Sequence, residues 1–168
     1  MHVPPIFQEN DPATLHGLIR NARLAQFVTA TDHGPIATPL PMFLDADEGE
    51  FGVLYGHLAR PNPQWQEPVL GDALAIFMGA DAYVSAGWYP SKQEHHKVVP
   101  TWNYEAVQAF GPVEFFSDTN RLLDVITRPT DQHEATHKQP WHVTDAPHAS
   151  IPGHIKGIVR PRLPRPRA

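Results

Sequence analysis

The segment LAQFVTATDHGPIATPLPMFL, residues 24–44, predicts two β-strands joined by a tight turn. Residues 24–31 and 36–44 are rich in Val, Thr, Ile and Phe, which strands favour, whereas Asp32-His33-Gly34-Pro35 between them has turn chemistry. Outside this segment, strands are expected at residues 51–57, 73–78, 83–85 and 104–116, the last bent at Gly111-Pro112. About six short strands separated by turns are typical of a small antiparallel barrel.

Helices are expected only at the edges of this barrel. Asn10-Asp11-Pro12 combines a capping side chain with Pro at the first helical position, which predicts a helix that ends near Asn21. Further helices are expected at residues 120–127 and within 149–159, with a loop or single helical turn at 60–68 and a polar, mobile stretch at 90–97. The predicted fold is mainly β with peripheral helices.

Composition narrows the class of protein. The chain has 168 residues, 41% of them hydrophobic, so it is long enough for one globular domain, predicted at residues 1–159. It has no cysteine, which excludes disulfides and thiolate metal sites. No apolar run approaches the ~20 residues of a membrane helix and residues 1–10 do not resemble a signal peptide, so we expect a cytoplasmic protein without membrane contact.

Charge is distributed unevenly. The formal net charge is -5, which argues against a large nucleic-acid-binding face. Residues 160–168 form a Pro/Arg-rich tail with four arginines and no acid, and we predict that this tail is disordered. DNA is therefore only a weak candidate partner.

Three stretches combine aromatic, basic and hydroxyl residues. They are Gly56-His57-Leu58-Ala59-Arg60-Pro61-Asn62-Pro63-Gln64-Trp65, then Tyr83-Val84-Ser85 running on to Trp88-Tyr89-Pro90-Ser91-Lys92, and Val99-Pro100-Thr101-Trp102-Asn103-Tyr104. Flavin mononucleotide (FMN) needs cations and hydroxyls at its phosphate, aromatic surface at its ring and donors near the ring nitrogens. The candidates for the phosphate are Arg60, Lys92, Ser85, Ser91 and Thr101; for the ring surface, Trp88, Trp102 and Tyr104; for the ring nitrogens, His57 and Asn103.

These stretches resemble the PaiB family of FMN-binding negative transcriptional regulators, and Pro140-Trp141-His142-Val143-Thr144-Asp145-Ala146-Pro147 is similar to a further family signature. The resemblance runs from about Val3 to about Val159. It implies a split β-barrel related to pyridoxamine-phosphate-oxidase-like flavoproteins, forming a homodimer with FMN between subunits. It also implies that Arg60 and Lys92 contact the phosphate and that Thr101, Trp102 and Asn103 lie near the ring.

The chain departs from the family pattern at two places. Ala37-Thr38-Pro39-Leu40-Pro41 stands where the family usually has A-x-H-x-P, so Pro39 replaces the histidine. Relatives also continue past Ile158-Val159 with another strand and a basic ending, where this chain has residues 160–168. These departures leave open a cofactor-free dimeric barrel as an alternative.

Structural roles are the competing interpretation of the same residues. Arg60 and Lys92 can be solvated or form ion pairs, and Trp88, Trp102 and Tyr104 can pack in a core or dimer interface. His133-Glu134-Ala135-Thr136-His137 matches the zinc motif H-E-x-x-H, but the window between Pro129 and Pro140 is too short for the long helix of such enzymes. No metal site is therefore predicted, although metal binding by His133 and His137 stays an open question.

Three functions compete at this level. The first is a PaiB-like FMN protein in negative control of transcription. The second is a flavin-dependent oxidoreductase acting on a small substrate, which rests on fold analogy. The third is the cofactor-free dimer. No catalytic side chain is predicted, because any redox chemistry would belong to the flavin.

Overall fold

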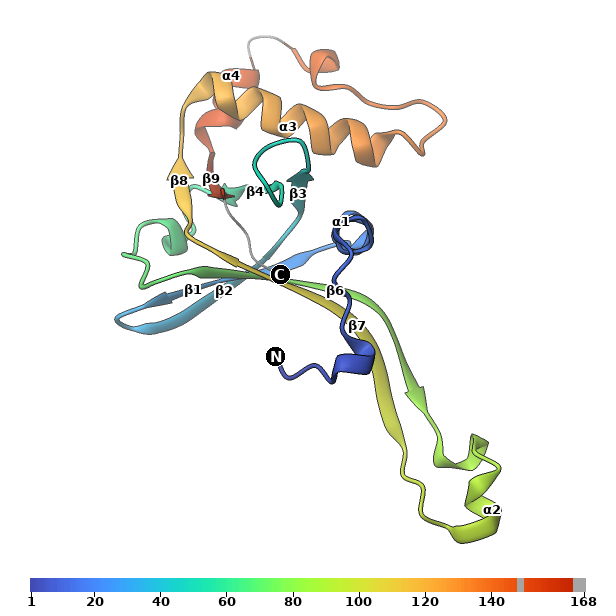
Figure 1. The fold of residues 1–168 in the computed structure, drawn as a ribbon. Helices are drawn as coiled ribbons and strands as arrows, with labels where there is room; N and C mark the ends of the chain where they lie inside the picture. The colour runs from blue at the N-terminus through green and yellow to red at the C-terminus, as the bar shows by residue number, and fades with distance from the viewer. Residues whose placement is uncertain (148–149, 165–168) are drawn as a thin grey trace.

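The computed structural model describes the backbone of residues 1–147 and 150–164, which form two antiparallel sheets with helices around them (Figure 1). The first sheet has the strand order β2-β1-β6-β7, formed by β1 (Ala25–Thr31), β2 (Gly34–Leu40), β6 (Ala73–Val84) and β7 (Thr101–Gly111). In the second sheet, β9 (Ile158–Leu163) pairs with β4 (Val53–Gly56) and β5 (Leu58–Ala59) on one edge and β8 (Glu114–Phe116) on the other, and β3 (Met42–Asp45) pairs with β4. The mainly β architecture is as predicted.

The core lies between the two sheets. Burial alternates along β1, so that Ala25 and Phe27 point inward, as expected for a strand with one solvated face. Phe27 meets Phe115 edge to face, with the ring centroids 6.4 Å apart. Leu54 and Leu163 close the core from the second sheet. Apolar side chains from strands far apart in sequence therefore hold the sheets together.

The predicted strand at residues 36–44 is divided in the structure. β2 ends at Leu40 and β3 starts at Met42, so the chain passes from one sheet to the other at Pro41. Proline cannot donate a ladder hydrogen bond, which makes it a suitable residue for this crossing.

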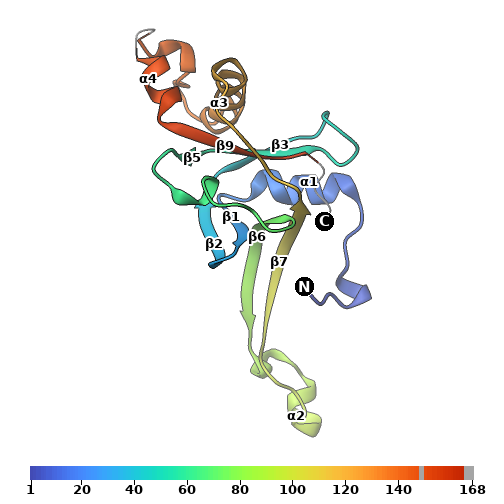
Figure 2. The same ribbon diagram turned by 90° about the vertical axis from the view of Figure 1, so that its left-hand side faces the viewer.

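The expected strands at residues 73–78 and 83–85 are one long strand. β6 continues through Gly79-Ala80-Asp81 with a shift of register between Met78 and Asp81. Beyond this shift β6 and β7 leave the body as a two-stranded ribbon, shown in two orthogonal views (Figures 1 and 2). We call residues 79–105 the arm, and its end holds two short helices, η3 (Ala86–Trp88) and α2 (Ser91–His95). The stretch at 90–97, expected to be mobile, contains α2.

The helices pack around the body. The predicted first helix is confirmed as α1 (Pro12–Asn21), whose N-cap Asp11 accepts a hydrogen bond from the Thr14 amide at 2.9 Å. α3 (Thr119–Glu134) is longer than the expected 120–127, because it continues through Pro129. The remaining helical pieces are η1 (Pro5–Phe7), η2 (Pro63–Trp65), η4 (Val143–Asp145) and α4 (Ile151–Lys156).

The predicted disorder from residue 160 onward is wrong for residues 160–163. They belong to β9, where Val159 and Leu163 are buried, so strand pairing and burial order this stretch despite its prolines and arginines. Residues 165–168 lie outside the described part of the chain. Among the described residues, every helix is too short or too polar to span a membrane.

Candidate functional site

The predicted flavin residues occupy two separate places. His57 and Arg60 lie on the body, on either side of β5, whereas Ser85, Ser91, Lys92, Thr101, Trp102 and Asn103 lie on the arm. β6 extends from the buried Ala75 to Val84, roughly 30 Å at ~3.3 Å per residue. Beyond the register shift of β6, Figures 1 and 2 show the arm directed away from the body. One chain therefore does not bring the two groups together.

The paired strands of the arm carry two neighbouring aromatic rings. The β6–β7 register places Trp102 opposite Tyr83, and their ring centroids are 6.0 Å apart. The Trp102 indole donates a hydrogen bond to Asp81 Oδ1 at 2.9 Å, which orients the ring. Trp102 nevertheless remains 58% exposed. The arm thus holds a fixed aromatic surface open to a further molecule.

Polar groups gather at the end of the arm. Ser85 Oγ caps η3 by accepting a hydrogen bond from the Gly87 amide at 3.1 Å. A Cβ placed on Gly87 would lie 3.3 Å from Ser85 Oγ and 4.0 Å from Lys92 Nζ. The structure therefore brings the Ser85 hydroxyl and the Lys92 ammonium close to the same glycine, and Ser91 opens α2 beside them.

The Arg60 side chain contacts other residues of the body. Its Nε donates to the Lys156 carbonyl and its NH2 donates to the Ile158 carbonyl at 3.2 Å. Its guanidinium also lies 5.9 Å from the centre of the Trp65 ring, and the Trp65 indole donates to the Arg60 carbonyl at 2.8 Å. Arg60 therefore links β5 to the α4–β9 connection, while its role at a phosphate stays a prediction.

The residues that follow Arg60 in the motif have structural partners. The Asn62 side chain accepts from the Gln64 amide at 2.9 Å and donates to Thr38 Oγ1 at 3.1 Å. Gln64 is fully buried, and its side-chain nitrogen lies 3.1–3.2 Å from three acceptors on β1 and β2. This part of the motif holds the η2 loop against the first sheet.

His57 has a neighbour that sequence reasoning missed. The β5–β9 register pairs Leu58 with Val159, so His57, immediately before β5, stands opposite Arg160. Arg160 is 1% exposed, and its three guanidinium nitrogens are buried without a hydrogen-bond partner among the described residues. Burial lowers the pKa of Arg160 to about 10, so it remains a cation at neutral pH.

His57 responds to this cation. The pKa of His57 is lowered, first by the removal of water from around the ring and then by the positive charge of Arg160. Part of His57 nevertheless remains exposed to solvent. Val159 and Leu163 are apolar residues at alternating positions, a pattern that is typical of a strand. This pattern is the sequence signal that could have placed Arg160 in a strand.

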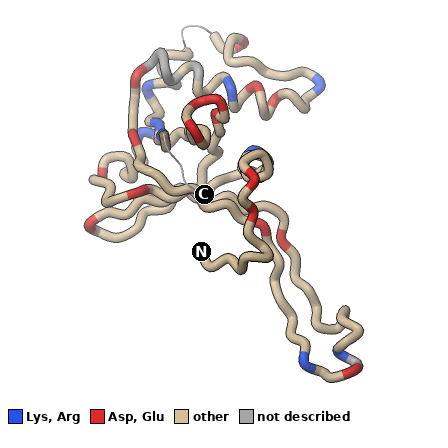
Figure 3. Tube along the Cα trace, viewed as in Figure 1, with Lys and Arg blue, Asp and Glu red and all other residues tan. Residues whose placement is uncertain are grey.

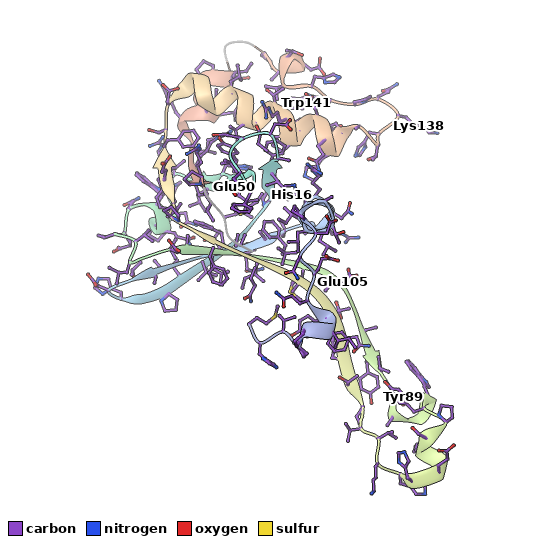
Figure 4. All side chains as sticks on the ribbon, viewed as in Figure 1. His16, Glu50, Tyr89, Glu105, Lys138 and Trp141 are labelled. Carbon is purple, nitrogen blue, oxygen red and sulfur yellow. The ribbon has the colours of Figure 1, made fainter. Side chains whose placement is uncertain are left out.

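A pocket of about 360 Å³ lies on the same face of the second sheet, beneath α3. Tyr55 and His57 line it from the sheet, and His133 lines it from the helix. Trp141 closes it from the segment that follows, and Figure 4 shows Trp141 beside α3, far from Tyr89 on the arm. The other lining residues are Pro41, Phe43, Gly56, Val125, Ile126, Pro129, Thr130 and Glu134.

The H-E-x-x-H segment does not have the continuous helical geometry of the zinc motif. α3 ends at Glu134, so His137 lies in the following turn rather than one helical turn along the same face. The Glu134 carboxylate accepts a hydrogen bond from the Trp141 amide at 3.0 Å. Among the described residues no group of three or more His, Cys, Asp or Glu side chains is placed to hold a metal ion.

The chemistry of the donors suits FMN. Within the described part of the chain, the buried guanidinium of Arg160 has no hydrogen-bond partner, and Lys92 adds a second cation near a hydroxyl. The Trp102–Tyr83 pair offers aromatic surface of the kind that flavin rings contact. A phosphate dianion attached to a flat ring system complements both features.

Comparison with known proteins supports this assignment. The chain is 28% identical over 160 residues to the Protease synthase and sporulation protein PAI 2 of Bacillus subtilis, covering 95% of this chain and 74% of that protein, which confirms the PaiB resemblance. An uncharacterized protein of Saccharomyces cerevisiae is 35% identical over 106 residues, 61% of this chain and 62% of that one.

Solved structures show the same fold. The flavocytochrome Anf3 from Azotobacter vinelandii superposes with a TM-score of 0.65 at 16% identity, covering 97% of this chain and 68% of that chain. An FAD and heme binding protein from Mycobacterium smegmatis superposes with a TM-score of 0.64 at 14% identity, covering 93% and 67%. Because the family described as "Putative FMN-binding domain" matches residues 1–164, the chain belongs to this FMN-binding family of split β-barrels, and FMN is the cofactor that its membership assigns.

Proposed function

We propose that the protein is a cytoplasmic, PaiB-like FMN-binding homodimer in which each flavin site combines the body of one protomer with the arm of the other. The observation that carries this proposal is the separation of the predicted site residues. His57 lies on the body and Lys92 lies near the end of an arm that points away from it. A second copy of the chain is the simplest source of the missing half.

The arm itself favours a partner. A two-stranded ribbon is marginally stable in water, and this one exposes large apolar side chains. Trp88 is 71% exposed and Trp102 is 58% exposed, and Tyr83 and Tyr104 on the same ribbon are also exposed. Burying these rings against a second body would stabilise both the ribbon and the dimer.

Each half would contribute different groups to the flavin. On the arm, Lys92, Ser85, Ser91 and Thr101 would hold polar groups of FMN, and Trp102 and Asn103 would flank its ring. FMN, when bound, supplies redox chemistry that the protein side chains cannot. The side chains orient the ring and exclude water from it.

The biological role that we propose is negative control of transcription, as in the family that the chain resembles. Lys and Arg residues are spread along the described chain rather than gathered in one part of it (Figure 3), and the net charge is -5. We therefore expect regulation through a protein partner rather than through tight DNA binding. A promoter fragment that shifts in a gel with this protein alone would contradict that mechanism.

A mixed dimer tests the shared site directly. We expect His57→Glu on the body and Lys92→Glu on the arm each to abolish FMN binding while the variants remain folded dimers. A heterodimer of the two variants, purified through two different tags, carries one site with both substitutions and one intact site. It should bind one FMN per two chains. A heterodimer that binds none would show that each site lies within one chain.

The flavin-dependent oxidoreductase is tested with the same material. Anaerobic addition of NADH or NADPH should leave the visible flavin absorbance of the dimer unchanged if the protein is a regulator. Rapid bleaching followed by reoxidation in air would favour the oxidoreductase instead.

A further inference from the structure

We propose that Arg160 receives the phosphate of FMN on the body side of the site, with His57 beside it. This inference rests on the proposed flavin function and names a residue that the motif resemblance did not include. In this proposal, Arg60 links β5 to the α4–β9 connection.

Arg60 and Arg160 differ in the partners of their guanidinium groups. Two of the Arg60 donors bond the carbonyls of Lys156 and Ile158, and its guanidinium lies against Trp65. The Arg160 guanidinium has no such partner among the described residues, although it is almost completely buried. A buried guanidinium without an anion is unfavourable, so this position gains most from binding one.

The neighbouring carboxylates do not supply that anion. Glu48 and Glu114 both pair with Arg162, which lies two residues further along β9 on the same face. Arg162 also donates a hydrogen bond to the Tyr55 hydroxyl at 3.1 Å. One arginine on this face is therefore fully partnered and the other is not, which makes Arg160 the position for an external anion.

The register of the sheet gives the route to Arg160. His57, which immediately precedes β5, stands across from Arg160 and also lines the pocket beneath α3. Arg160 lies outside the lining of this pocket, so His57 is the member of the pair that a molecule there would contact first. Because the guanidinium nitrogens are covered in the flavin-free chain, the phosphate would bind after a side chain beside Arg160 moves. Two nitrogen-bearing side chains then face the same anion.

The test compares FMN with riboflavin, which has the same ring and no phosphate. Dissociation constants of the intact dimer are measured from flavin fluorescence for the natural protein and for Arg160→Met, Arg160→Lys and Arg162→Met. Arg160→Met should weaken FMN binding roughly 10- to 100-fold and leave riboflavin binding within about twofold. Arg160→Lys should retain part of the preference for FMN, and Arg162→Met should retain all of it.

The possible failures are distinguishable. If the Arg160→Met variant keeps the natural preference for FMN over riboflavin, the proposed flavin function stands and the role of Arg160 is overturned. Equal weakening of both flavins would also overturn it, because it would indicate a structural role for Arg160. If the natural protein binds neither FMN nor riboflavin, the proposed flavin function fails, and the role of Arg160 fails with it.

Discussion

Replacing Arg160 by methionine should make the flavin-free protein more stable. Arg160 places a positive charge inside the protein, 1% exposed and without a partner among the described residues. Methionine has a similar length and keeps the apolar contacts of the arginine stem, but it brings no charge. Substitution at most buried positions destabilises a protein, so an increase would be diagnostic.

The pKa of Arg160 sets the expected size of this increase. Burial lowers this pKa from its ordinary value to about 10, a shift of between two and three units. At about 1.36 kcal/mol for each pKa unit, the buried charge costs roughly 3 kcal/mol. Replacement of buried charged groups by apolar residues has a similar range of effects, about 1–4 kcal/mol. For a chain of this size the melting temperature should rise by roughly 6–12 °C.

The assay is thermal and urea unfolding of the flavin-free protein at pH 7 and at one protein concentration, since dimer stability depends on concentration. Arg162→Met is the matched control, because Arg162 is partnered by Glu48 and Glu114, and its removal should lower stability by about 1 kcal/mol. If Arg160→Met is as destabilising as this control, the cation has a partner in solution and the reasoning is refuted.

Three further perturbations test the body of the protein. Gln64→Leu removes the buried donor to three acceptors on β1 and β2 and should cost about 2–3 kcal/mol in urea unfolding, whereas the exposed Gln66→Leu should change little. Gly56→Ala should cost about 1–3 kcal/mol, because the new Cβ would collide with the Leu40 side chain; unchanged stability would mean that this contact relaxes freely. The lowered pKa of His57 means that the unfolded chain binds more protons between that pKa and 6.5. Stability should therefore fall as the pH drops through this window, and His57→Gln should flatten the curve; equal slopes would contradict the assigned cause.

Much of the secondary structure follows from local pattern. The Asn10-Asp11-Pro12 cap starts α1 as predicted, and a turn at Asp32-His33, within the predicted turn, joins β1 to β2. These features depend on a few consecutive residues, so the sequence alone predicts them. The break between β2 and β3 at Pro41, in contrast, depends on which sheet each half joins.

The arm was harder to predict. Gly79-Ala80-Asp81 has the composition of a turn, yet β6 runs through it because β7 pairs with both sides of the irregularity. The role of the aromatic and basic residues of the arm at a flavin stays a prediction. Their distance from His57 and Arg60 could not be read from the sequence, because it depends on the length of the paired ribbon.

By itself, the sequence determined the mainly β class, the family and the residue types suited to FMN, since these depend on motifs and short-range periodicity. Only the tertiary structure decided which groups surround Arg60 and Arg160. For Arg60, the motif indicates a phosphate ligand, which stays a prediction, and folding adds two backbone carbonyls that accept hydrogen bonds from its guanidinium. Arg160 lies in a stretch that looks disordered, but pairing of β9 with β5 and β8 buries it opposite His57. The partners of a side chain are set by contacts between distant segments, which local sequence does not encode.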